Sequence, residues 1–459
     1  RFRAACAHHA ANCPMAQFVA QRCAHEMKEL PLSATPKAGI AVPRGVADVL
    51  EQLRGLTTAD RAARVERAVR NLFTDALMRL PDGTVFVLTG DIPAMWLRDS
   101  TWQLRPLLAA AHEAQTYEVL AAVSRRQAAY VLLDPYANAF NPSPNGNCWH
   151  RDFESQSPWV FERKYELDSL AAFLDLALRL HRASNRCDHL DEQFVAAATL
   201  ALEIIEREQQ HDPASYQFVR LGAAAHDQLS HDGFGAPVGR TGMSWSGFRP
   251  SDDACTYGYL IPANAHAAVV LEQLADLPAL VHLAEPIRAK ARAIAGDIRA
   301  GISAHAVTVK DERRIYAYEV DGLGQQVHMD DANVPSLLSL PYLGWCEPDD
   351  ALYAATRDWV LSDANPWFSR GAAGFGIGSP HTPPSHIWPI AIAMVGLTST
   401  DPHEVADCLD LLEATDGGTG RMHESFHCDS PDVFTRAWFS WADMTYVHLV
   451  LRSVGLAFD

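Results

Sequence analysis

Apolar residues recur at spacings of three and four along most of this chain, and that period constrains its fold more than any other feature. It is clearest in residues 58–80, where Val65, Val69 and Leu72 fall on one face and Thr57 or Thr58 is placed to cap the helix. The same period predicts helices at 167–181, 194–209, 263–274, 286–302, 386–397, 404–414 and 442–454, and more weakly at 102–113, 117–133, 334–340 and 350–361.

About a dozen helices with few strand signals predict an all-α fold. Only 83–91 and 313–322 have the pattern of short hairpin arms. Amphipathic helices in this number fit a closed toroid of two concentric helix rings with an open funnel at one end. An α-solenoid or an irregular helical domain would share the period, although no sequence repeat supports a solenoid. We expect residues 1–44 to form an N-terminal extension packed on a single domain, 45–459.

Charge and composition exclude several classes of partner. The formal net charge is −18, which disfavours nucleic acid and anionic membranes but suits a neutral sugar. No run approaches the roughly 18 apolar residues of a membrane span. We expect a monomer. The sequence begins at Arg1, so we expect a truncated or processed N-terminus, and the compartment stays open between cytoplasm and secretion.

The nine cysteines, an odd number without a CxxC pair, are expected to be free thiols. Three of them lie close to histidines near the N-terminus, but their spacing fits no zinc pattern, and we expect neither a metal nor a cofactor. The group consists of Cys6, Cys13, Cys23, His8, His9 and His25.

The loops between the helices concentrate charged and aromatic side chains, as a carbohydrate site requires. Charged groups grip sugar hydroxyl pairs, and aromatic rings stack on the apolar faces of sugars. The segments are 89–101, 148–170, 242–264, 327–345, 376–389 and 421–443. For several of their acidic residues, helix capping or ion pairing explains the position equally well. Our candidates for substrate binding are Asp91, Trp96, Arg98, Asp99, Glu166, Asp168, Arg249, Asp331, Asn333, His381 and Trp388.

Glycoside hydrolysis normally needs two carboxyl groups across the scissile bond. Asp252 and Glu424 meet that description, although spacing alone does not select them over Asp168 or Asp331. Asp253 adjoins Asp252, so the two side chains should point different ways and raise one another's pKa, which would keep a general acid protonated.

Six long motifs in these loops resemble glycoside hydrolase family 125, the exo-α-1,6-mannosidases. They are TGDIPAMWLRDST, WVFERKYELDSL, GMSWSGFRPSDDACTYGYLIPAN, VHMDDANVPSLLSLPYLG, GIGSPHTPP and RMHESF, and they extend from about residue 85 to the C-terminal region. The resemblance implies an (α/α)6 barrel, an inverting mechanism and no catalytic metal. It also implies that Glu424 is the general base and that an aspartate of SDDAC, Asp252 or Asp253, is the general acid. Analogy with related toroidal hydrolases favours Asp252.

Three other interpretations fit parts of this pattern. A second inverting toroidal hydrolase, of the α-glucosidase or trehalase type, would share the fold and the carboxyl pair. A carbohydrate-binding protein without activity would not need both carboxylates, and a sugar epimerase would depend on a histidine pair. The expected substrate is an α-mannoside oligosaccharide, cleaved at its terminal non-reducing α-1,6-linked mannose.

Overall fold

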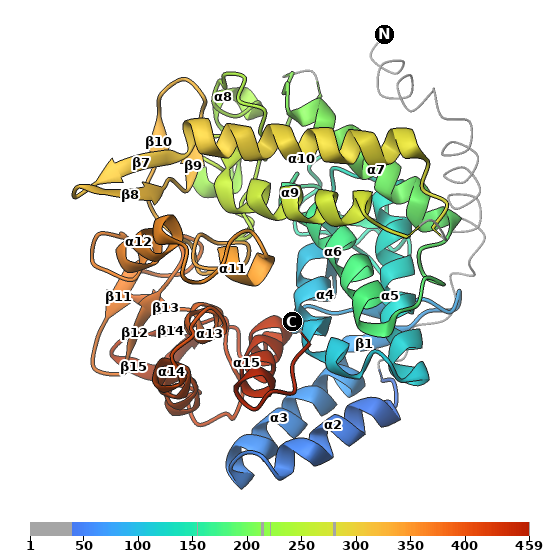
Figure 1. The fold of residues 1–459 in the computed structure, drawn as a ribbon, viewed down its shortest axis with the longest axis vertical. Coiled ribbons are helices and arrows are strands. Elements are labelled where there is room, and N and C mark those ends of the chain that lie inside the picture. Colours follow the sequence, from blue (N-terminus) through green and yellow to red (C-terminus); the bar gives the residue numbers. More distant parts are fainter. Residues whose placement is uncertain (1–38, 154, 213–214, 221, 279–280, 459) are drawn as a thin grey trace.

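The computed structural model describes residues 39–153, 155–212, 215–220, 222–278 and 281–458, so the N-terminal Cys/His group and most of the predicted extension lie outside the described residues. Within these ranges the chain is mostly helical, and the helices are arranged around a central region (Figure 1). The helices are α2 (Arg44–Arg54), α3 (Ala59–Asn71), α4 (Leu97–Leu104), α5 (Ala114–Leu133), α6 (Leu167–Ser184), α7 (Glu192–Glu208), α8 (Ser230–Gly233), α9 (Ile261–Ala275), α10 (Glu285–His305), α11 (Leu340–Leu343), α12 (Ala351–Val360), α13 (Pro389–Leu397), α14 (Pro402–Ala414) and α15 (Ser440–Ser453).

The helices differ in how much of their surface is buried. Those whose residues are buried almost throughout are α4, α6, α9, α13 and α15, and they contact one another in the succession α9–α6–α4–α15–α13. The more amphipathic α3, α7, α10 and α14 each pack on a neighbour and keep a polar outer face. Helices that are apolar all round belong inside a fold, whereas amphipathic ones belong at its surface. None of the described helices is both long and apolar enough to span a membrane.

Short antiparallel strands connect the helices in sheets of two or three strands. The strand order is β1-β2, β3-β4-β5, β10-β9-β6, β7-β8, β11-β12 and β13-β14-β15. Their bounds are β1 (Leu77–Arg79), β2 (Val85–Val87), β3 (Met95–Trp96), β4 (Ala139–Phe140), β5 (Val160–Glu162), β6 (Tyr259–Leu260), β7 (Val307–Lys310), β8 (Arg313–Tyr316), β9 (Glu319–Val320), β10 (Gln326–Val327), β11 (Phe368–Arg370), β12 (Phe375–Ile377), β13 (His386–Ile387), β14 (Ser425–His427) and β15 (Ser430–Thr435).

Two helix predictions are wrong in instructive ways. Residues 58–80 do not form one helix: Thr58 caps α3 as expected, but a π-turn at Leu72–Ala76 follows, and β1 then pairs with β2. The segment 334–340 is irregular, because the backbone amides of Leu337 and Leu338 donate to the buried Asp330 carboxylate rather than to a helix ladder. Asp330 therefore anchors a loop instead of capping a helix.

The first and last parts of the described chain meet beside α4. Helix α15 packs against both α4 and α3, and Gly90 forms an antiparallel bridge with Phe439. Gly90 has a φ of 142°, and a Cβ there would collide with the Trp438 carbonyl, so this close approach requires glycine. The arrangement brings the loop before α4 next to the loop before α15.

Candidate active site

A cavity of about 450 Å³ lies where α4, α13 and α15 begin. Trp96 and Trp388 occupy the N-cap positions of α4 and α13, and Trp441 lies in the first turn of α15. All three line the cavity. Because helix N-termini carry partial positive charge, this end of the helices favours carboxylates and polar ligands.

Arg98 is the central cation of the site and is only 2% exposed. Its guanidinium lies within ion-pairing distance of Asp99 (3.2 Å), Glu166 (2.5 Å), Asp168 (3.3 Å) and Asp252 (3.1 Å). One cation therefore holds carboxylates from three different segments. We predicted that Arg98 contacts substrate. It does line the cavity, but most of its donors already serve these acids.

The adjacent Asp252 and Asp253 have different surroundings. Asp252 lines the cavity, has a left-handed φ of 68° and keeps 23% of its side chain exposed. Asp253 is buried away from the cavity, and its carboxylate lies 3.1 Å from His381 Nδ1. Non-glycine residues in this backbone region are uncommon and concentrate at functional sites. The strained turn thus presents Asp252 and uses Asp253 as an internal partner.

Asp252 and Glu166 form a hydrogen-bonded carboxyl pair with opposite pKa shifts. Burial raises the pKa of Glu166 well above its ordinary value. Burial acts on Asp252 in the same direction, but the charges of Arg98 and Lys164 outweigh it and lower its pKa. The expectation of a raised pKa at Asp252 is therefore wrong, because the charges of the neighbouring cations decide the direction of the shift. Of the two carboxyls, Glu166 therefore has the greater tendency to hold a proton.

Glu424 reaches the cavity from the segment just before β14 and is 6% exposed. Arg436 lies 3.4 Å from its carboxylate and also donates to Asp91 Oδ1 at 2.8 and 2.6 Å. Asp91 does not line the cavity itself. It holds the arginine that contacts Glu424, so its side chain is placed to position this carboxylate.

His381 lines the cavity beside Asp253. Burial alone would lower its pKa, but the hydrogen bond and charge of Asp253 raise it to about 9. At neutral pH the imidazole is therefore cationic.

For Asp99, in contrast, burial outweighs the neighbouring charge. It raises the pKa of this carboxyl to about 6 despite the nearby Arg98.

The predicted substrate-binding residues divide into two groups. Trp96, Arg98, Asp99, Asn333, His381 and Trp388 line the cavity. Asp91, Glu166, Asp168, Arg249 and Asp331 do not line it and bind side chains of the protein instead.

Two members of the second group show how such residues support the site. Arg249 donates to Glu319 at 2.5 Å, and that carboxylate accepts two backbone amides of the same loop. Asp331 accepts from Asn333 at 2.9 Å and from Ser379 at 3.1 Å. Asp331 thereby orients Asn333, which does line the cavity.

Several cavity residues were not among our candidates: Trp149, Lys164, Arg220, Asp227, Arg436 and Trp441. Trp149 and Lys164 lie in the charged loop that was singled out, and Trp441 in the aromatic C-terminal one. Arg220 and Asp227 come from a segment with no distinctive composition, and they pair at 2.8 Å. Nothing in the sequence near these two residues indicates that they meet.

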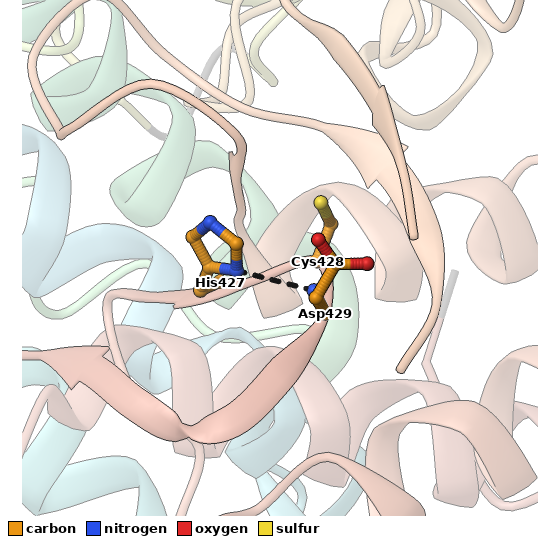
Figure 2. A group of neighbouring side chains, drawn as sticks. All are labelled: His427, Cys428 and Asp429. Atoms are coloured by element: carbon orange, nitrogen blue, oxygen red, sulfur yellow. Dashed lines mark hydrogen bonds between the residues drawn. The ribbon is translucent and has the colours of Figure 1, made fainter. Parts of the chain in front are cut away.

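Among the described residues, one group of three potential metal ligands has its ligand atoms within 4.8 Å of one another: His427, Cys428 and Asp429 (Figure 2). Two of the three already have protein partners. His427 Nδ1 accepts from the Asp429 amide at 3.2 Å, and Asp429 Oδ1 accepts from the Ala372 amide at 2.8 Å. Burial raises the pKa of the Cys428 thiol, which disfavours the thiolate that metals bind. The group lies outside the cavity lining and does not fit a catalytic metal.

Comparison with known proteins gives consistent matches across the chain. Residues 57–451 match the family described as metal-independent alpha-mannosidase (GH125). The Meiotically up-regulated gene 157 protein of Schizosaccharomyces pombe is 36% identical over 437 residues, covering 90% of this chain and 85% of that protein.

Solved structures match as well. A metal-independent α-mannosidase of Streptococcus pneumoniae, in a non-productive complex with α-1,6-mannobiose, superposes with a TM-score of 0.88 at 45% identity, covering 90% of this chain and 99% of that one. The family 78 rhamnosidase of Bacillus sp. GL1 shares the fold at 13% identity, with a TM-score of 0.50 over 86% of this chain and 35% of that one.

Proposed function

Because the chain belongs to the metal-independent α-mannosidases of glycoside hydrolase family 125, we propose that it is an inverting exo-enzyme that removes terminal α-1,6-linked mannose. In this mechanism Asp252 is the general acid and Glu424 the general base. The acid protonates the leaving oxygen while the base activates a water on the opposite face of the sugar.

The observation that carries this assignment is the cavity that Asp252 and Glu424 share. Other carboxylates line it, but Asp227 and Glu162 are each paired with both Lys164 and Arg220, at 2.6–3.4 Å. Asp99 is buried against Arg98. Glu424 has one long contact, at 3.4 Å with Arg436, which leaves its oxygens available to a water molecule.

The proton for the leaving group comes from the Glu166–Asp252 pair. Two buried carboxylates in contact do not both ionise readily, and burial raises the pKa of Glu166, which favours a proton on this pair. Asp252 is the member that lines the cavity, so the proton reaches the glycosidic oxygen through Asp252. Apo geometry need not show the catalytic hydrogen bond, since it tightens on substrate binding.

An exo mode is supported by the burial of part of the cavity lining. Arg98, Trp388 and Trp441 line the cavity and are each about 2% exposed, which fits a pocket that takes a chain end. The architecture that we propose for this scaffold is an (α/α)6 toroid whose inner ring includes α4, α6, α9, α13 and α15. The contacts in the succession α9–α6–α4–α15–α13 support it.

The substrate class rests on the relatives. The S. pneumoniae protein was studied in the processing of N-linked glycans and binds α-1,6-mannobiose. We extend this to α-1,6-mannosides of oligosaccharides or N-glycans here.

The decisive test is proton NMR of the first product released from α-1,6-mannobiose. Inversion requires β-mannose, and the Asp252 and Glu424 carboxyls should then stand about 6.5–9.5 Å apart. An initial α-anomer would mean retention. Turnover of glucosides but not mannosides would favour the α-glucosidase or trehalase alternative.

A further inference from the structure

A second cavity, of about 280 Å³, lies at the opposite end of the buried helices from the candidate active site. Arg105 follows the last residue of α4, Leu397 ends α13, and Arg452 lies in the last turn of α15. All three line this cavity, whereas the candidate active site lies where the same helices begin. Trp441 and Arg452 are eleven residues apart along α15, or about 16 Å, so the two cavities are distinct.

The charged lining of the second cavity is almost entirely basic. It consists of Arg105, Arg179, Arg182 and Arg452, with the exposed Glu347 as its one acid. This excess of cations contrasts with the net charge of −18 for the whole chain. A cavity lined by one sign of charge concentrates ligands of the opposite sign, so this cavity favours anions.

Two of the arginines come from one face of α6. Arg179 and Arg182 are three residues apart, a spacing that places both side chains on the same side of the helix. Arg179 is 5% exposed and donates through Nε to Asp175 at 2.8 and 2.9 Å. Among the described residues, its Nη1 and Nη2 atoms have no hydrogen-bond partner, and Arg182 pairs with no acid.

Capping of helix ends explains part of this arrangement. Helix C-termini carry partial negative charge, and arginine donors satisfy their free carbonyls. Arg452 donates through Nη1 to the Leu397 carbonyl, and Arg105 donates through Nη2 to that of Tyr342. Each contact uses only one of several N–H donors. No acid in the described part of the chain pairs with Arg452, so capping leaves the cavity positively charged.

The arginine charges converge beside His448, a buried residue of α15 whose Nδ1 lies 2.9 Å from the Tyr342 hydroxyl. Burial lowers the pKa of His448 well below its ordinary value, and the charges of Arg105, Arg179 and Arg452 lower it further. The imidazole is therefore neutral. Three segments of the fold thus direct positive charge to one place.

We propose that this cavity binds the phosphate group of a small phosphorylated molecule. Planar guanidinium groups match phosphate oxygens in bidentate geometry, and hydrogen bonds between charged groups are the stronger kind. Pockets for larger ligands extend from about 300 to 1,000 Å³, so a volume of about 280 Å³ fits a sugar phosphate better than a nucleotide. Gln273 and Glu347 also line the cavity and offer polar groups to sugar hydroxyls. The site does not depend on the proposed function, because none of its residues lines the candidate active site.

Isothermal titration calorimetry with glucose 6-phosphate, inorganic phosphate and glucose tests this assignment at a constant ionic strength of about 0.1 M. We expect glucose 6-phosphate to bind at one site per chain, inorganic phosphate to bind more weakly, and glucose not to bind there. Arg182→Gln and Arg452→Gln should each raise the Kd for glucose 6-phosphate about tenfold, because each removes a charge-assisted contact. Arg314→Gln is the matched control, since Arg314 is an exposed arginine of β8 outside the cavity, and its Kd should equal that of the wild type.

The remaining outcomes would overturn the assignment. If neither phosphate compound binds, the cavity is not an anion site. If both bind but Arg182→Gln and Arg452→Gln leave the Kd unchanged, the anion lies elsewhere on the protein. Binding of inorganic phosphate alone would contradict the sugar phosphate. Arg182→Gln keeps the test valid if loss of the Arg452 donor destabilises α13, because Arg182 is exposed and its replacement breaks no ion pair of the described chain.

Discussion

Replacing Arg98 by methionine should destabilise the protein in a pH-dependent way. Arg98 is 2% exposed and is the shared partner of Asp99, Glu166, Asp168 and Asp252. Methionine keeps much of the apolar volume but removes the charge, which leaves buried carboxylates uncompensated. Removing one partner of a buried ion pair costs about 3–5 kcal/mol.

The expected shift in Tm follows from the size of the chain. An unfolding entropy of about 2.1 cal/mol/K per residue, over 459 residues, gives about 1 kcal/mol/K. The free-energy loss therefore corresponds to a Tm about 3–5 °C lower at pH about 7, measured by differential scanning calorimetry. Arg70→Met is the matched control, since Arg70 is 64% exposed and its pair with Glu66 should contribute little.

The pH dependence gives the sharper criterion. Without Arg98 the folded-state pKa values of these carboxyls rise above their unfolded values, so stability is retained at low pH and lost as pH rises through the raised values. The Tm deficit of the variant should therefore be smaller at pH about 5 than at pH about 8. A deficit that stays constant or grows on acidification would refute the role of Arg98 as the balancing charge.

Three further predictions concern the carboxylates and their partners. Glu424→Gln should still bind mannoside but lose about 10²–10⁴ in turnover, because no group then activates water; near-normal turnover would contradict its role. Asp252→Asn should abolish cleavage of natural mannosides but spare dinitrophenyl leaving groups, whereas Asp253→Asn should mainly lower the Tm; exchanged phenotypes would make Asp253 the acid. The pKa of His381 is raised from 6.5 to about 9, so its stabilisation is complete below pH 6.5 and is lost as pH rises through 9. The Tm difference between wild type and His381→Gln should accordingly shrink between pH about 6 and about 10, and a widening difference would show that the ion pair with Asp253 has the wrong sign.

Local signals in the sequence predicted local structure well. Thr58 caps α3 by accepting from the Arg61 amide, as its position before an apolar period indicates. The apolar period from residue 65 to 80 nevertheless predicted a longer helix than the one observed. The helical segment ends before Leu77, because Leu77 and Met78 pair with Val87 and Phe86 in a hairpin. The apolar period indicates which side chains are buried, and pairing with another strand can bury the same side chains as a helix would.

The candidate site shows the same limit. The loop motifs identified Arg98, Asp252 and Glu424, all of which line one cavity. The sequence could not show that Asp252 lies 3.1 Å from Arg98, 154 residues away, or that this cation would lower its pKa. Arg220 was missed because the residues around it in the sequence form no recognisable motif. It pairs with three carboxylates that come together only in the folded chain.

The join between α15 and the loop before α4 has a consequence for synthesis. Arg436, which contacts the proposed base Glu424, is held by Asp91, a residue 345 positions earlier. A growing chain therefore exposes Arg98 and its surrounding acids long before the C-terminal loop exists to complete the cavity. Contacts of such sequence separation form slowly, because a long loop must close first. A ribosome-bound chain that stops before Arg436 lacks both Trp441 and the Asp91–Arg436 ion pair, so we expect hydrolytic activity only after α15 has been made and has docked.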